Sequence, residues 1–317
     1  MKAAIVAEAG RSPIYGDFRN PTPASGKSII KVNASTISHV TRGRAAGTHY
    51  SSEGTLPCVP GIDGVGVDPE GKRVYFLSPE QPFGAMAEFS LVDDRHRFTI
   101  PDALSDEAAA AMAIPGMSSW AALVERAILR PGETVLVNGA TGASGRLAIQ
   151  IAKHLGAKKV IATGRQVRQF DDLRRLGADA VIALTEDREA LEQLFKREFS
   201  QGVDIVLDYL WGPSTETLVI AAAKASPEGV PVRFVQIGSI GGASINLPGA
   251  ALRSTALQLM GSGIGSVPLP KMLKAIQNML AAAPGAGFEI ATECLPLASV
   301  TDAWSRLDSS PRIVLVP

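Results

Sequence analysis

A glycine-rich turn in the middle of the chain has the residue types and the spacing that can hold a pyrophosphate group. It reads NGATGASG over residues 138–145 and follows the pattern AxGxxG. The apolar run TVLVNG leads into it and GRLAIQIAKHLGA leads out of it, which predicts a strand, a turn and a helix. Gly142 would let the backbone approach the anion, Gly145 would let the helix pack on the strand, and N–H groups at the helix start would bind phosphate oxygens. The alternative is a turn that only connects a strand to a helix.

The end of the next predicted strand indicates which dinucleotide the turn holds. An NAD-binding unit has Asp or Glu about 20 residues further on, where it binds the ribose 2′-hydroxyl. Here Gly164 takes that place, Arg165 follows, and Arg168 comes one turn later. Glycine leaves room for a 2′-phosphate and a guanidinium binds it in a bidentate way, so we expect NADPH, although Arg168 could be a solvated charge. The residues assigned to the cofactor on these grounds are Ala140, Thr141, Gly142, Ala143, Ser144, Gly145, Gly164, Arg165 and Arg168.

The elements that must position this turn alternate between strand and helix from about residue 132. This alternation predicts an α/β fold with a doubly wound parallel sheet of Rossmann type, whose ligands lie outside the carboxyl ends of the strands. Gly156 is expected to end the first helix. The predicted strands are 134–139, 159–163, 180–184, 203–209 and 232–238, and the predicted helices are 145–157, 165–178, 187–199 and 215–225.

The two flanks of this unit have a different pattern. Short alternating runs such as KSIIKVNAS and RVYFL, broken by Pro, Gly and Asp, predict an irregular β-rich domain in the first part of the chain. The tail holds an amphipathic helix, LPKMLKAIQNMLAAA, and two strand-like pieces that are typical of the first domain. We therefore expect domains at residues 1–115 and 116–264, with a return to the first domain over 265–317.

Composition limits the classes of function. Of 317 residues 46% are apolar and 20% charged, and the net charge is zero, which is typical of a soluble globular protein and gives no sign of nucleic-acid or membrane binding. No apolar run approaches the ~20 residues that span a bilayer, and the N-terminal sequence has no signal-peptide pattern. Two distant cysteines, Cys58 and Cys294, indicate no disulfide framework, so we expect a cytoplasmic location.

Over its full length the chain resembles the medium-chain dehydrogenase/reductases. Four stretches carry the resemblance: PGIDGVGVD (60–68), AMAIPGMSSWAAL (111–123), RPGETVLVNGATGASGRLAIQIAKHLGA (130–157) and LRRLGADAVI (173–182). The first stretch and the AxGxxG turn are similar to the zinc-free quinone oxidoreductase branch, which includes zeta-crystallin. The resemblance implies a GroES-like catalytic domain and a homodimer joined by the last Rossmann strand, which would be TALQLMGSG at 255–263.

The resemblance also bears on metal binding. Zinc-containing members of the family have a His-Glu pair where this chain has Ile62 and Asp63, and isoleucine cannot bind a metal. The chain also lacks the four clustered cysteines of a structural zinc site. We therefore expect no metal, with the nicotinamide carrying the difficult step.

Residues around the reacting atoms are implied by the same resemblance. The segment 34–50 corresponds to the active-site wall, where Ser38 and Thr41 stand in place of the Asn and Asp of many relatives. Tyr50 is the first candidate for donating a hydrogen bond to the acceptor oxygen, with His49 and Ser38 behind it; each could instead be a wall residue. The residues implied near the nicotinamide are Ser118, Leu210, Ile237, Gly238 and Ser239.

The function expected from these features is NADPH-dependent reduction of a quinone or an α,β-unsaturated carbonyl compound, with a small molecule as the only partner besides a second copy. Two alternatives stay open. One is reversible oxidation of an alcohol, which the absence of zinc ligands disfavours. The other is an NADPH-binding protein with little catalysis, in a structural or sensing role.

Overall fold

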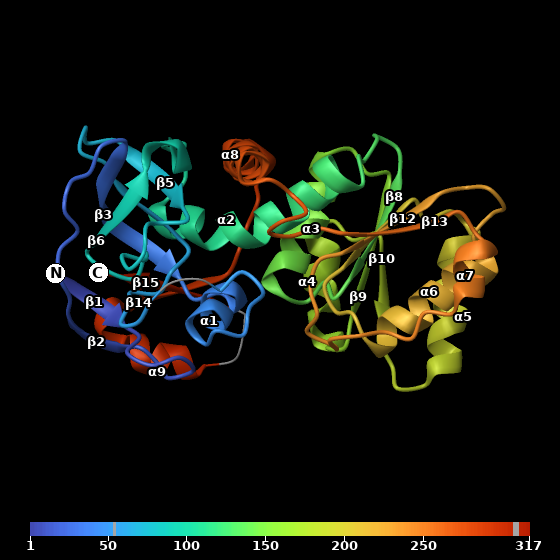
Figure 1. Ribbon diagram of the computed structural model, residues 1–317. Coiled ribbons are helices and arrows are strands. Elements are labelled where there is room, and N and C mark those ends of the chain that lie inside the picture. The colour runs from blue at the N-terminus through green and yellow to red at the C-terminus, as the bar shows by residue number, and fades with distance from the viewer. Residues whose placement is uncertain (53–54, 307–310) are drawn as a thin grey trace. The chain divides into compact units, whose positions relative to one another are not determined.

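A computed structural model describes residues 1–52, 55–306 and 311–317, and the chain divides into two compact units (Figure 1). Unit 1 consists of Met1–Ile114 and Ile276–Pro317, and unit 2 consists of Pro115–Ala275. Two helices contain the boundaries: α2 (Asp106–Ala121), which continues as a π-helical turn over Ala122–Arg126, and α8 (Leu269–Ala286).

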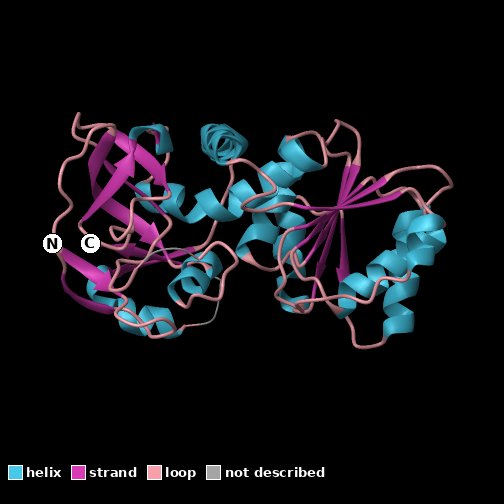
Figure 2. Ribbon diagram, viewed as in Figure 1, coloured by secondary structure: helices cyan, strands magenta, loops and turns pink. Residues whose placement is uncertain are grey.

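Unit 2 contains the predicted doubly wound sheet (Figure 2). Its six strands are all parallel to their neighbours and lie in the order β10-β9-β8-β11-β12-β13. The order reverses between β8 and β11, which makes their carboxyl ends the switch point where ligands of such sheets bind. The strands are β8 (Thr134–Asn138), β9 (Lys159–Gly164), β10 (Ala180–Ala183), β11 (Ile205–Asp208), β12 (Val232–Gln236) and β13 (Leu257–Gly261).

The helices of unit 2 follow the strands as predicted, with two differences. They are α3 (Ala143–His154), α4 (Phe170–Arg175), α5 (Arg188–Ser200), α6 (Pro213–Ala225) and α7 (Gly249–Arg253). Of these, α7 was not predicted, and α4 is shorter than expected. The segment expected as one helix over 165–178 instead forms a 3₁₀ turn at Val167–Gln169 followed by the short α4. Gly156, with φ of 92°, follows α3 as expected.

The core of unit 2 explains why its strands are mainly apolar. Leu136, Val206 and Phe234 from neighbouring strands pack in one cluster with Phe195 of α5 and Leu218 of α6. All five are fully buried, and burying a side chain of this size contributes about 1.5–3 kcal/mol. Among the described residues no helix is both long and apolar enough to cross a membrane.

Unit 1 is built on a seven-stranded, mostly antiparallel sheet. Its path runs β14-β15-β3-β4-β5-β7, β6 pairs with β3 beside it, and β1 and β2 form a separate hairpin. Because β15 pairs with β3, the tail of the chain returns to the first sheet. The strands are β1 (Lys2–Ile5), β2 (Ile14–Asp17), β3 (Lys27–Thr36), β4 (Asp63–Val67), β5 (Arg73–Leu77), β6 (Phe89–Asp93), β7 (Arg97–Thr99), β14 (Thr292–Pro296) and β15 (Arg312–Val316), and the helices are α1 (His39–Ala45) and α9 (Val300–Ser305).

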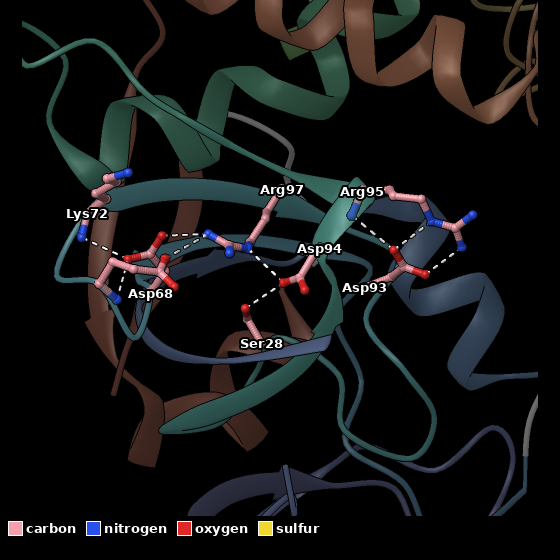
Figure 3. Close-up of polar contacts among 8 residues, drawn as sticks. Ser28, Asp68, Lys72, Asp93, Asp94, Arg95 and Arg97 are labelled. Atoms are coloured by element: carbon pink, nitrogen blue, oxygen red, sulfur yellow. Dashed lines mark hydrogen bonds and ion pairs between the residues drawn. The ribbon is translucent and has the colours of Figure 1, made fainter. Parts of the chain in front are cut away.

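A polar network fixes one edge of this sheet (Figure 3). Arg97 binds the buried carboxylate of Asp68 and donates to Asp94 at 3.1 Å, and Asp94 accepts from Ser28 at 2.6 Å. Asp68 also accepts the backbone N–H of Lys72 at 2.9 Å. The network joins the β4–β5 turn to β3 and β7, so it stabilises the scaffold of unit 1.

Candidate active site and cofactor site

The glycine-rich turn leaves the end of β8 and opens α3. Gly142 is the N-cap residue, and a Cβ built there would meet no heavy atom within 4 Å. A Cβ on Gly145 would lie 2.5 Å from both Ala140 Cα and Gly139 O, which confirms that Gly145 permits close packing of the helix. The backbone N–H of Ala140 donates to Thr163 O at 2.8 Å and ties the turn to β9. The turn therefore fits a pyrophosphate, with an open approach at Gly142 and a fixed helix start.

A buried polar network lies beneath this turn, and sequence reasoning did not find it. Asn138, Thr163 and Asp208 occupy the carboxyl ends of β8, β9 and β11, and all three are fully buried. Thr163 Oγ1 donates to Asn138 Oδ1, and Asn138 Nδ2 donates to Asp208 Oδ1, both at 2.8 Å. Burial raises the pKa of Asp208, while Thr215 and the other donors oppose this shift. The available signal was a polar residue ending each apolar run.

Asp208 also holds the loop that follows β11. Its carboxylate accepts the backbone N–H of Leu210 at 3.1 Å and that of Trp211 at 3.2 Å. Trp211 has φ of 57°, a left-handed conformation that costs a bulky residue about 1–3 kcal/mol and persists only when its surroundings fix it. The buried carboxylate supplies that constraint.

The loops after β11 and β12 pack backbone against backbone. Gly241 N donates to Leu210 O at 2.7 Å. A Cβ on Gly238 would lie 2.6 Å from Tyr209 O, and one on Gly212 would lie 2.6 Å from Gly241 O. No side chain fits between the two loops at these glycines. The contact brings together the implied residues Leu210, Ile237, Gly238 and Ser239, because Asp208 O also accepts the N–H groups of Ile237 and Gly238.

Ser118 lies near the end of α2, beside a second hydroxyl cluster. Its Oγ donates to Pro115 O at 2.8 Å. The neighbouring Ser119 is fully buried and bonds to the Tyr209 hydroxyl at 2.7 Å and to Ser144 O at 3.1 Å. Ser119 and Tyr209 were not expected from the sequence, and they connect α2 to the loop after β11 and to the start of α3.

Gly164 and the two arginines lie at the end of β9. A Cβ on Gly164 would lie 2.5 Å from Thr141 Cγ2, so glycine lets the turn cover the end of this strand. Arg165 follows directly, and Arg168 belongs to the 3₁₀ turn. Both are exposed, and within the described part of the chain neither guanidinium has a hydrogen-bond or ion-pair partner. Both charges are therefore available to an anion.

In unit 1 the three catalytic candidates lie at the two ends of α1. Ser38 is the N-cap: its Oγ accepts the N–H of Thr41 at 3.0 Å and lies 2.8 Å from Thr41 Oγ1. His49 and Tyr50 follow the helix, with their rings stacked at a centroid distance of 4.3 Å. Ser38 is buried, whereas Tyr50 is 72% exposed. The structure thus brings His49 and Tyr50 together, and the Ser38 hydroxyl is engaged in capping.

The hydrogen bonds of His49 define its state. Ser51 N donates to His49 Nδ1 at 3.2 Å, and Ser51 Oγ lies 2.8 Å from the same atom. Partial burial, followed by the nearby Arg44, lowers the pKa of His49. The ring is therefore neutral near pH 7, with its proton on Nε2.

Contacts from the tail of unit 1 hold α1. Arg42 donates to the carbonyl oxygens of Trp304 and Arg306, the second at 2.6 Å, and its guanidinium lies 5.4 Å from the centre of the Trp304 ring. An arginine that donates to two carbonyls and stacks on an indole is fixed in position. Because Arg42 belongs to α1, this anchor also positions the segment that carries His49 and Tyr50.

Ile62 and Asp63, which stand where zinc-containing relatives have a His-Glu pair, are both buried. Tyr75 Oη donates to Asp63 Oδ2 at 3.1 Å, and burial raises the pKa of Asp63 to about 7 against the opposing charge of Arg312. Asp63 therefore belongs to a buried polar cluster of the unit 1 sheet. Among the described residues, no three His, Cys, Asp or Glu side chains are grouped as a metal site would require.

Comparisons with known proteins identify the family. A family model described as zinc-binding dehydrogenase matches residues 143–282. The probable NADPH-dependent quinone reductase tdiC of Emericella nidulans is 30% identical over 365 aligned positions that cover 100% of both chains. The quinone oxidoreductase of Homo sapiens is 31% identical over 223 positions, 66% of each chain. The quinone oxidoreductase of Thermus thermophilus, solved also in complex with NADPH, superposes with a TM-score of 0.83 at 26% identity and covers 100% of both chains.

Fold, turn and sequence similarity agree with the resemblance noted in the sequence. The chain belongs to the medium-chain dehydrogenase/reductase superfamily, in its quinone oxidoreductase branch.

Proposed function

We propose that this protein is an NADPH-dependent, zinc-independent reductase that transfers hydride to a quinone or an α,β-unsaturated carbonyl compound. The observation that carries the proposal is the similarity of the whole chain to a quinone reductase. The fold agrees with it, because the glycine-rich turn lies at the switch point of the sheet and is open at Gly142. NADPH, when bound, supplies the hydride. The residues of the chain must hold the cofactor, orient it and stabilise the charge that develops on the acceptor oxygen.

We assign the cofactor to unit 2. The turn from Ala140 to Gly145 would bind the pyrophosphate, since its N–H groups begin α3 and Gly142 leaves the approach open. Arg165 and Arg168 would bind the 2′-phosphate beside Gly164. The nicotinamide end is assigned to Ser118 on α2 and to Leu210, Ile237, Gly238 and Ser239, which lie on two loops that hydrogen bonds to Asp208 hold in place.

We assign the acceptor chemistry to unit 1 as the GroES-like catalytic domain. Tyr50 is the proposed donor to the developing oxyanion, because its exposed hydroxyl has no partner among the described residues. His49 stacks on this ring and would hold it in position. Ser38 caps α1, so we give it a positioning role in the same wall.

Zinc independence is part of the proposal and rests on Ile62 and Asp63. An isoleucine offers no ligand atom, and the Asp63 carboxylate is hydrogen-bonded to Tyr75 within the sheet. The family model described as zinc-binding dehydrogenase matches residues 143–282, a range that does not include these two positions.

A homodimer is also proposed, through β13. This strand is at the edge of the unit 2 sheet, and Leu259 on it is 37% exposed. An edge strand with an exposed apolar side chain favours pairing with a second copy. Leu259→Lys should disrupt this pairing, and light scattering should then give the molar mass of a monomer where the wild-type protein gives that of a dimer.

We also propose a cytoplasmic location, which rests only on the two cysteines that are far apart in the sequence.

The deciding experiment is a fluorescence titration with NADPH and NADH, followed by steady-state turnover with simple quinones. We expect a preference for NADPH that falls about tenfold in Arg165→Ala, because a charge-assisted hydrogen bond is lost. Turnover of enones but not quinones would narrow the acceptor class. Binding of neither cofactor would overturn the proposal.

The two alternatives give different results in the same assay. Alcohol-dependent reduction of NADP would indicate a dehydrogenase of the alcohol type. Tight NADPH binding without turnover of any quinone or enone would indicate a structural or sensing protein.

A further inference from the structure

A third arginine lies beside the glycine-rich turn, and neither the sequence pattern nor the proposal above uses it. Arg146 follows Gly145 on α3, with its side chain 20% exposed. Its Nε donates to Thr141 O at 3.3 Å. Its terminal nitrogen lies 3.4 Å from Gln169 Oε1 and 3.5 Å from Asp172 Oδ2.

These contacts place Arg146 against the segment that carries the two other arginines. Thr141, whose carbonyl Arg146 binds, covers Gly164 with its methyl group. Gln169 belongs to the same 3₁₀ turn as Arg168. The Arg146 guanidinium therefore contacts Thr141, which packs against Gly164, and Gln169, which follows Arg168.

The present partners of Arg146 hold it weakly. All three contacts are at the long end of the hydrogen-bond range, and the carboxylate of Asp172 is 54% exposed. Arginines that brace this fold are held more tightly: Arg306 binds both oxygens of Glu293 at 2.7 and 2.6 Å. Arg146 thus retains donors for a better acceptor than Asp172.

We propose that Arg146 is a third ligand of the cofactor 2′-phosphate and a determinant of the preference for NADPH. A phosphate monoester carries a charge of about −1.5 to −2 and three strong acceptor oxygens, so it competes well with one exposed carboxylate. On binding, Arg146 exchanges Asp172 and Gln169 for phosphate oxygens and keeps its bond to Thr141. This inference rests on the proposed NADPH dependence.

The test compares the Kd values of NADPH and NADH for the wild-type protein and for three variants. Arg146→Gln should raise the Kd of NADPH about tenfold and that of NADH less than about twofold, since only NADPH carries the 2′-phosphate. Asp172→Asn removes the competing carboxylate, so it should leave NADPH binding unchanged or tighter. Arg174→Gln is the matched control, because it removes an equal charge from α4 where the arginine is bound to Asp171 at 2.8 Å. It should change neither Kd.

Other outcomes overturn the inference. If Arg146 only joins α3 to α4, or if it binds the pyrophosphate, Arg146→Gln should weaken the binding of NADPH and NADH equally. If it joins the two helices through Asp172, Asp172→Asn should also weaken the binding of both cofactors. If Arg146→Gln unfolds at the assay temperature, Arg146→Lys keeps the charge and should still lose part of the NADPH preference. If the wild-type protein shows no preference for NADPH, both the proposed cofactor and the proposed role of Arg146 are wrong. If the wild-type protein prefers NADPH and Arg146→Gln keeps that preference, only the proposed role of Arg146 is wrong.

Discussion

The side-chain amide of Asn138 donates to the carboxylate of Asp208 at 2.8 Å and joins the carboxyl ends of β8 and β11. Thr163 extends this link to β9, and Leu210 and Trp211 extend it to the following loop. The side chains of Asn138, Thr163 and Asp208 are all fully buried, so leaving one of their donors or acceptors without a partner would cost free energy. One network therefore sets the position of three loops in the proposed cofactor site.

Replacing Asp208 by asparagine should loosen these loops together. The new amide nitrogen cannot accept the hydrogen bonds that the lost oxygen accepted, so we expect the free energy of unfolding to fall by about 2–3 kcal/mol. Thr215→Val, which removes one donor to the same carboxylate, should cost about 1 kcal/mol. Urea denaturation measures both values. Unchanged stability of Asp208→Asn would contradict a structural role for the network.

Substitutions at two glycines of the turn should have different effects, one on NADPH binding and the other on the stability of the fold. Gly142→Ala adds a methyl group in open space at φ of −78°, so stability should change by less than about 0.5 kcal/mol while NADPH binding weakens. Gly145→Ala forces a Cβ to 2.5 Å from the backbone and should destabilise the fold by about 1–3 kcal/mol. Thermal unfolding and NADPH titration measure the two effects. Wild-type affinity in Gly142→Ala would exclude Gly142 from the site.

The hydroxyl of Tyr50 should contribute to turnover and not to cofactor binding. Tyr50→Phe is expected to lower kcat with a simple quinone by about 10²-fold, the usual loss for one donor to a developing oxyanion, with the Kd of NADPH unchanged. Tyr15→Phe is the control, because Tyr15 lies on β2 and is also exposed. Equal kcat values for the two variants would assign the donor role elsewhere.

Asp63 should make stability depend on pH. Its pKa rises from 3.8 to about 7 in the fold, so between these values the folded state binds more protons than the unfolded state. Stability should therefore decrease as pH rises from about 4 to 7, with a slope of up to about 1.4 kcal/mol per unit from this group. Asp63→Asn should reduce that slope. Urea denaturation at several pH values compares the two proteins, and parallel profiles would show that Asp63 titrates as in the unfolded chain.

The doubly wound sheet and its glycine turn could be predicted because each rests on a local pattern. Apolar runs mark strands buried on both faces, and a turn rich in glycine at a helix start has a direct physical meaning. The network of Asn138, Thr163 and Asp208 could not be predicted, because its members come from three strands whose order in the sheet is set by packing. The same holds for Ser119 and Tyr209, 90 residues apart in the chain, and for the anchor between Arg42 and the tail.

The return of β15 to pair with β3 has a consequence for how the chain folds as it is synthesised. Unit 2 is continuous, so its sheet can form as soon as residue 275 has left the ribosome. The sheet of unit 1 must wait, since β14 and β15 follow all of unit 2 in the chain and β3 has one neighbour missing until they arrive. The earlier part of unit 1 is then the stretch most exposed to chaperones or to mispairing, and a long pause in translation after unit 2 should lower the yield of active protein.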